Sequence, residues 1–95
     1  MQEQLELDLE WLMGAFRGPL VGLLASSGAP WGEAEELAQE AFAEAWIGRR
    51  RFRGDPTDVD ALGRWLRGIA MNLLAASRRR SERIRPLASE PARES

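Results

Sequence analysis

The sequence predicts an all-α fold, a small bundle of three to four helices. Apolar residues recur at three- and four-residue steps along most of the chain, and no stretch shows the sustained alternation of a β-strand. Breaks rich in Gly and Pro near residues 26–30 and 53–56 divide the chain into three helical segments. A chain of 95 residues has the length of one compact domain with one small core.

The first helix is expected over residues 3–26. Pro19 lies inside it, where it lacks an N–H and crowds the carbonyl of Ala15, so we expect a kink or a break near Arg17. The apolar face of this helix is expected to comprise Leu5, Leu9, Leu12, Phe16, Leu20, Leu23 and Leu24.

The second helix is expected over residues 30–51. Gly28 can take a left-handed conformation after the first helix, and Pro30 suits the first position of the next. The apolar stripe of this helix is Ala34, Leu37, Ala38, Ala41, Phe42, Ala45 and Trp46. Its other face is acidic and carries Glu36, Gln39, Glu40, Ala43 and Glu44.

The third helix is expected over residues 57–84. Thr57 and Asp60 resemble a capping box at its start, and Pro86 predicts its end. At about 100° per residue, Asn72 and Arg79 lie beside Trp65 on one flank. The core stripe is Leu62, Trp65, Leu66, Ile69, Ala70 and Leu73. We expect a domain over residues 1–85, followed by a disordered tail or the start of an interdomain linker over residues 86–95.

The composition excludes most enzyme chemistry. The chain has no Cys, His, Tyr or Lys, which removes disulfides, thiolate or imidazole metal sites, Cys or Lys nucleophiles and His acid–base catalysis. Glu36 and Glu40 lie one helical turn apart, but two carboxylates on an exposed face are ordinarily solvated rather than bound to Mg²⁺. We therefore expect a binding module, not an enzyme, with no catalytic residue, metal or cofactor.

Charge is distributed unevenly along the chain, whose net charge is −2. Residues 1–48 carry nine acidic residues and one Arg, a net charge of −8, whereas residues 49–95 carry twelve Arg and six acidic residues, a net charge of +6. This asymmetry indicates two partners, one of them a polyanion; ordinary solvated surfaces are the alternative. Neither a membrane span nor a secretory signal is recognisable, so we expect a cytoplasmic protein without membrane contact.

Two blocks of sequence carry a family resemblance. Residues 33–42 with Ala45-Trp46, followed by residues 65–72 and Arg78-Arg79-Arg80, resemble region 2 of bacterial RNA polymerase sigma factors, most closely the extracytoplasmic-function (ECF) type. The resemblance covers roughly residues 10–81 and implies a helical bundle of the sigma-factor region 2 type. It also implies transcription initiation: binding to the β′ clamp helices of core RNA polymerase, and recognition and melting of the promoter minus-ten element.

The resemblance assigns residues to both partners. The core-polymerase face would be Glu36, Leu37, Gln39 and Glu40. For single-stranded non-template DNA, the turn would form the rim of a base pocket, Asn72 would bond a base edge and the arginines would neutralise phosphates. For Trp65, core packing is favoured over DNA contact through an exposed edge, and Trp46 and Phe42 are expected in the core. The DNA-binding set is Arg53, Gly54, Asp55, Pro56, Thr57, Trp65, Asn72, Arg78, Arg79 and Arg80.

Departures from the family pattern leave the promoter preference open, because Met71 replaces a common Arg, Ala76 a common acid and Arg78 a usual hydrophobic residue. Nothing after Arg80 resembles the second, helix-turn-helix domain of such factors, so the chain is either a domain excised from a longer factor, which we favour, or a natural single-domain variant. An anti-sigma factor is a possible further partner. The alternative interpretation is a helical protein-interaction or adaptor module without DNA binding.

Overall fold

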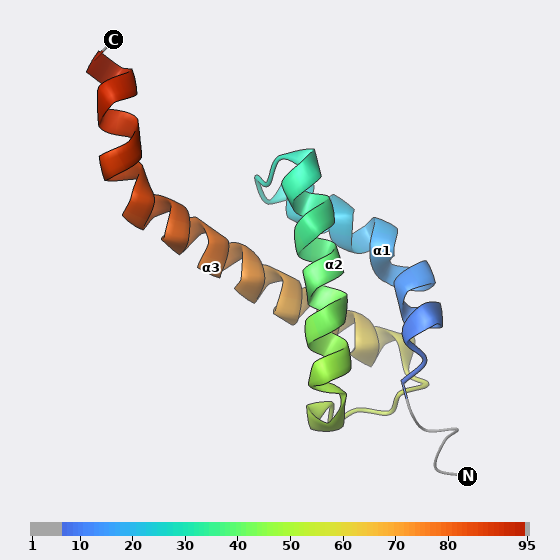
Figure 1. Ribbon diagram of the computed structural model, residues 1–95. Coiled ribbons are helices and arrows are strands. Elements are labelled where there is room, and N and C mark those ends of the chain that lie inside the picture. The colour runs from blue at the N-terminus through green and yellow to red at the C-terminus, as the bar shows by residue number, and fades with distance from the viewer. Residues whose placement is uncertain (1–6, 95) are drawn as a thin grey trace.

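Three α-helices form the part of the chain that the computed structural model describes, which is the backbone of residues 7–94 and the side chains of residues 7–83. The helices are α1 (Leu9–Ser26), α2 (Trp31–Ile47) and α3 (Val59–Glu94), with a 3-10 turn, η2 (Arg49–Arg51), after α2 (Figure 1). No strand occurs among these residues, which confirms the predicted all-α class. None of the described helices is long and apolar enough to cross a membrane.

The helix α1 begins at an aspartate cap and runs unbroken through a proline. The Trp11 backbone N–H donates to Asp8 Oδ1 at 3.2 Å, which satisfies one of the free donors of the first turn. Of the two outcomes expected near Arg17, a kink or a break, the break is wrong, because α1 is continuous across Pro19. Apolar side chains on both sides of Pro19 are buried in one core, and this packing holds the two halves of α1 together. The predicted start at residue 3, and Leu5, lie outside the described residues.

The connection between α1 and α2 is a glycine-capped turn, as predicted. Gly28 has φ of +109°. Its N–H donates to Ala25 O at 3.0 Å, and the Ala29 N–H donates to Leu24 O at 3.1 Å. This pair of hydrogen bonds is the Schellman motif. Pro30 lies one position earlier than predicted, as the N-cap of α2 and not as its first residue.

The core lies between the three helices and is wholly apolar among the described residues. In α2 the buried positions include four alanines, which bring the helix close to its neighbours. The predicted stripes of α2 and α3 are confirmed for most positions, with Leu74 fully buried in α3 where Leu73 is half-buried. The largest fully buried side chains are Leu12, Leu20, Leu24, Leu62, Leu66 and Leu74.

Trp46 was expected in the core, and this is wrong, because its side chain is 37% exposed. At 100° per residue it lies on the edge of a stripe that is centred on the alanines of α2. The Arg49 guanidinium carbon lies 3.9 Å from the Trp46 ring centroid, and Arg49 Nη1 donates to Trp46 O at 2.7 Å. The tryptophan therefore packs against a cation at the surface.

The second helix also ends at Ile47 and not at residue 51, because the three arginines form η2.

The start of α3 is capped by Asp58, not by the predicted Thr57. Asp58 Oδ1 accepts from the backbone N–H groups of Asp60 and Ala61 at 3.1 and 3.3 Å. The Thr57 hydroxyl instead donates to Asp55 Oδ1 at 2.8 Å, within the preceding turn. An acceptor directly before the first helical residue, Val59, decides where α3 begins.

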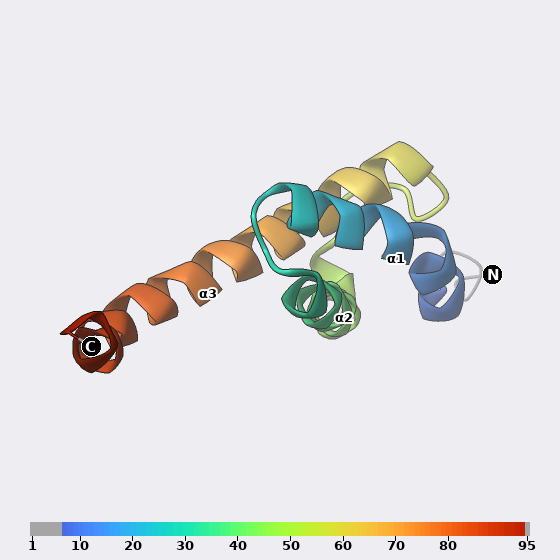
Figure 2. The same ribbon diagram turned by 90° about the horizontal axis from the view of Figure 1, so that it is seen from above.

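The far end of α3 also differs from the prediction, because the helix continues past Pro86 to Glu94. A proline inside a helix removes one backbone hydrogen bond and bends the helix, and Figure 1 shows α3 changing direction toward its C-terminal end. Seen from above in Figure 2, α3 crosses the α1–α2 pair and extends well beyond it. The linker role of residues 86–95 stays a prediction.

Candidate functional site

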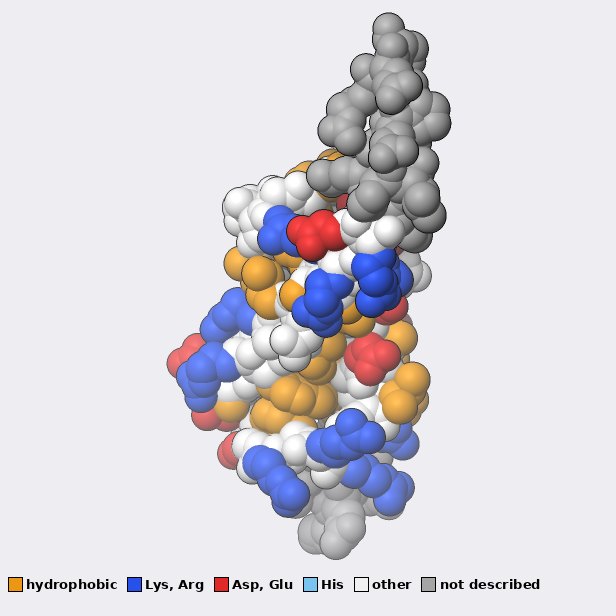
Figure 3. Space-filling model, turned by 90° about the vertical axis from the view of Figure 1, so that its left-hand side faces the viewer, with side chains coloured by type: hydrophobic (Ala, Val, Ile, Leu, Met, Phe, Trp, Pro, Cys, Tyr) orange, Lys and Arg blue, Asp and Glu red, His pale blue; other side chains and the backbone are white. Residues whose placement is uncertain are grey.

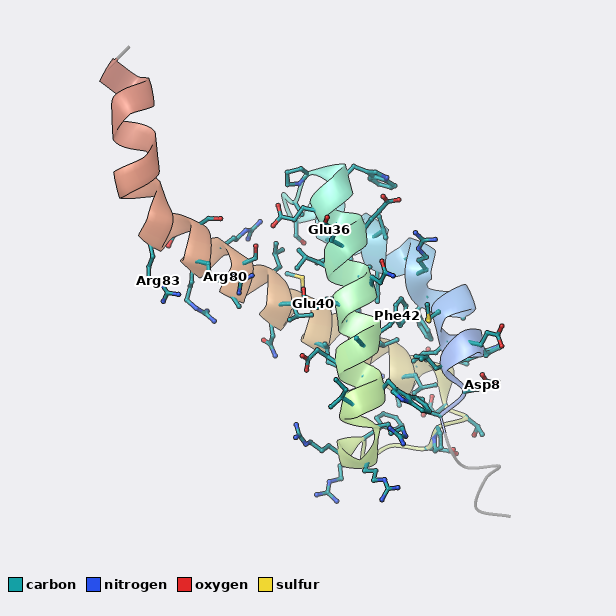
Figure 4. The ribbon with its side chains drawn as sticks, in the orientation of Figure 1. Asp8, Glu36, Glu40, Phe42, Arg80 and Arg83 are labelled. Carbon is teal, nitrogen blue, oxygen red and sulfur yellow. The ribbon has the colours of Figure 1, made fainter. Side chains whose placement is uncertain are left out.

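The outer face of α2 is acidic, as predicted, but one residue assigned to it lies in the core. Glu36, Gln39 and Glu40 are exposed, whereas Leu37 is 4% exposed and packs between the helices. Figure 4 shows Glu36 and Glu40 on α2, with Phe42 on the side of the helix that faces α1. A partner on this face would meet carboxylates and an amide, and Leu37 would support the face from beneath.

The turn before α3 is organised by Asp55. Its Oδ1 accepts from the Thr57 backbone N–H at 2.9 Å as well as from the Thr57 hydroxyl. These two hydrogen bonds, the backbone one first, lower the pKa of Asp55 below its ordinary value of 3.8, so the carboxylate stays ionised near neutral pH. The positive charge of Arg53 and the negative charge of Asp55 both face solvent. Every predicted rim residue except Pro56 is exposed: Arg53, Gly54, Asp55 and Thr57.

Phe52 anchors this turn to α3, a role that the sequence analysis missed. Its ring packs on Trp65 with centroids 4.8 Å apart and planes tilted by 37°. A Cβ added to Gly54 would lie 2.8 Å from Phe52 Cζ and 3.2 Å from Ala61 Cβ, so only glycine fits between them. One signal was visible in the sequence: Phe52 is a single aromatic residue inside an arginine-rich turn.

Trp65 is half-buried. One part of it packs on Phe52, and another borders a hollow of about 120 Å³ where the end of α2 meets α3. The wall of this hollow combines one carboxylate and one guanidinium with an aromatic ring. Its lining residues are Glu44, Gly48, Arg51, Trp65 and Ile69.

One flank of α3 aligns Trp65, Asn72 and Arg79. Steps of seven residues return to nearly the same side of a helix, and Asn72 and Arg79 are both exposed. Arg80 and Arg83 are also exposed, and Figure 4 shows them where α3 extends past α2. Basic and aromatic groups with an amide between them are the groups that hold phosphates and unpaired bases.

Arg78 does not share that flank. It lies about 100° from Arg79 around the helix, and its guanidinium donates to the Ser27 backbone carbonyl in the α1–α2 connection. All three arginines are exposed, but only Arg78 is hydrogen-bonded to the α1–α2 connection, so the predicted set of three is divided.

Arginines also lie away from the end of α3, on the side of the molecule that Figure 3 shows. Figure 3 shows basic side chains low on this face, at mid-height along its left edge and again higher up, with hydrophobic and some acidic side chains among them. The 3-10 turn η2 itself consists of three arginines, Arg49–Arg51. Basic side chains interspersed with apolar surface suit a strand whose phosphates and bases alternate.

The sequence comparisons identify the family. The family model Sigma-70 region 2 matches residues 12–84, which is well over half of the chain. No curated protein and no solved structure matches the chain. The matched segment begins at Leu12, the first buried residue of α1, and contains every core residue described above. The chain belongs to the sigma-70 region 2 family, whose members bind RNA polymerase and recognise promoter DNA.

Proposed function

We propose that this domain docks on the β′ clamp helices of core RNA polymerase through the exposed carboxylates of α2 and, in that complex, holds melted minus-ten promoter DNA along α3. The observation that carries the proposal is the separation of charge in the folded domain. Carboxylates line the outer face of α2, while arginines occupy η2 and the exposed flank of α3. Two unlike surfaces suit two unlike partners.

The polymerase face is proposed to consist of Glu36, Gln39 and Glu40, with Leu37 beneath them. A row of carboxylates on one helix is complementary to a basic partner helix and steers its approach. This face needs no rearrangement before docking, because its three polar side chains are already exposed.

The DNA face is proposed to run from the turn of Arg53, Gly54, Asp55 and Thr57 along the flank of Trp65, Asn72 and Arg79 to Arg80. Unpaired bases contact the exposed edge of Trp65 and hydrogen-bond to Asn72, while Arg79 and Arg80 neutralise phosphates. Arg78 is left out of this set because it faces the α1–α2 connection.

The proposed mechanism uses binding energy alone. Contacts to unpaired non-template bases offset part of the unstacking cost, which is a few kcal/mol per base step, and the polymerase supplies the rest. The domain carries no catalytic step of its own. The proposal also places the chain with the ECF type of sigma factor in the cytoplasm, where an anti-sigma factor can cover either surface.

The polymerase face is tested by recovery of core polymerase on immobilised domain. The double variant Gln39→Ala, Glu40→Arg should lose most of the recovery, because it removes an amide and reverses one charge. Glu10→Arg is the matched control, since Glu10 is an exposed acid on α1 and its substitution makes the same charge change. Equal recovery by the wild type and the double variant would refute this face.

The DNA face is tested by fluorescence anisotropy of a labelled single-stranded minus-ten oligonucleotide added to the domain bound to core polymerase. Asn72→Ala and Arg79→Ala should weaken binding, and Arg79→Ala should also lower the slope of log affinity against log salt by about 0.7. Arg67→Ala is the control on another side of α3. Polymerase binding without any oligonucleotide binding would instead favour an adaptor module whose acidic helix is its only functional surface.

A further inference from the structure

We propose that Arg78 is a positioning residue that holds the distal arm of α3, residues 75–83, against the α1–α2 connection. The arm begins after Leu74, the last buried side chain described in α3. By fixing the arm, Arg78 sets the direction in which Arg79, Arg80 and Arg83 leave the bundle. The consequence for DNA binding rests on the proposed function, whereas the geometric part does not.

Arg78 contacts the C-terminal end of α1, where a positive charge is favourable. Ser27 is the C-cap of α1, and the last turn of α1 contains no basic residue. Free carbonyl groups and the helix dipole make a helix C-terminus partly negative. The Arg78 guanidinium donates to the Ser27 carbonyl across 51 residues of sequence. It thereby supplies from α3 the positive charge that α1 lacks.

Gly28 leaves the room that this contact requires. A Cβ built on Gly28 would lie 2.7 Å from Arg78 Nη2, closer than two such atoms approach, so an added methyl group displaces the guanidinium. The same residue has φ of +109°, which forms the turn that presents the Ser27 carbonyl to α3. A side chain at residue 28 would therefore both strain this turn and crowd the tip of Arg78.

A second hydrogen bond ties the arm to α2. Ser77 Oγ donates to Glu33 Oε2 at 2.8 Å, in the first turn of α2. Arg78 and Ser77 thus reach the two ends of one connection, one at the end of α1 and the other at the start of α2. A hollow of about 290 Å³ separates the arm from this connection, so polar contacts hold the arm there in place of close apolar packing.

The position of the arm matters because the arm is long. From Leu74 to Arg83 the helix rises about 13 Å, so a rotation of about 20° at Leu74 moves Arg83 by roughly 5 Å. Such a shift is large compared with the length of a hydrogen bond to a phosphate. Releasing Arg78 should therefore misplace the exposed arginines without removing any of them.

The test measures the direction of the arm without DNA. Because the chain has no native Cys, nitroxide labels can be attached at Ala43→Cys on α2 and Glu82→Cys on the arm. Pulsed electron paramagnetic resonance then reports the distribution of distances between them. Arg78→Gln should broaden or shift this distribution by several ångströms, and Arg78→Lys should give a distribution closer to that of the wild type. Arg79→Gln is the matched control and should leave it unchanged.

A DNA measurement separates positioning from direct contact. Arg78→Gln should weaken binding of the minus-ten oligonucleotide to the polymerase-bound domain and at the same time alter the distance distribution, because the misplaced arginines then contact fewer phosphates. A direct phosphate contact by Arg78 itself would instead weaken binding with an unchanged distance distribution, and this pair of results would overturn the proposal. An unchanged distribution in Arg78→Gln would also overturn it. If the wild type binds no oligonucleotide, the DNA function fails, and the distances still decide the role of Arg78.

Discussion

Replacing Leu66 by Ala tests the packing on which both proposed surfaces depend. Leu66 is 0% exposed and belongs to a core that receives side chains from all three helices. The substitution removes buried methyl groups and leaves a cavity, and neighbours on several sides limit its collapse. We expect a loss of about 3–5 kcal/mol in the free energy of unfolding. A domain of this size has roughly 5–14 kcal/mol in total, so the loss is a large share.

The assay is thermal and urea unfolding followed by circular dichroism of the helices. For a domain of this length each kcal/mol lowers the Tm by about 4–8 °C, so Leu66→Ala should lower it by at least about 12 °C. Ile47→Ala is the matched control, because Ile47 is 74% exposed and its truncation should change stability by less than about 0.5 kcal/mol. Similar losses in the two variants would refute the assignment of Leu66 to the core.

Three further predictions concern the turn before α3. Asp58→Ala should cost about 1 kcal/mol in urea unfolding, because two backbone N–H groups lose their acceptor; an unchanged urea midpoint would contradict the cap. Gly54→Ala should cost about 1–3 kcal/mol, since the new methyl group displaces Phe52, and an unaltered aromatic NMR spectrum would argue against that contact. The lowered pKa of Asp55 means that the stabilisation by its hydrogen bonds is present above about pH 3.8 and is lost as the pH falls through the lower, folded value. The Thr57 amide NMR shift should follow this titration and should stop doing so in Asp55→Asn.

Local patterns predicted the helices and most of the core. The apolar stripe of α2 and the glycine turn at Gly28 follow from helix periodicity and from backbone conformation, which short sequences determine. The cap of α3 was placed one residue too early because Thr57 and Asp58 both carry acceptors, and only the structure shows that the first backbone N–H groups donate to Asp58. Pro86 predicted a helix end, whereas α3 continues through it.

In the candidate site, too, some residues could be predicted from the sequence and others could not. The alignment of Trp65, Asn72 and Arg79 follows from the seven-residue spacing and was predictable. Phe52 and Arg78 were not correctly assigned, because their partners are distant in sequence: Phe52 packs on Trp65, and Arg78 reaches Ser27. Helix periodicity places a side chain on a face, but it does not say which loop that face meets.

The inner face of α2 consists largely of alanines, so the packing of this helix does not depend on the side chains of its outer face. Ala34, Ala38, Ala41 and Ala45 are all within 1% of complete burial, while the opposite side consists of solvated side chains. Substitutions on the outside can therefore exchange every charge there without disturbing the fit to the neighbouring helices. Divergent copies of such a domain could acquire different binding preferences by surface changes alone, with the same scaffold retained throughout.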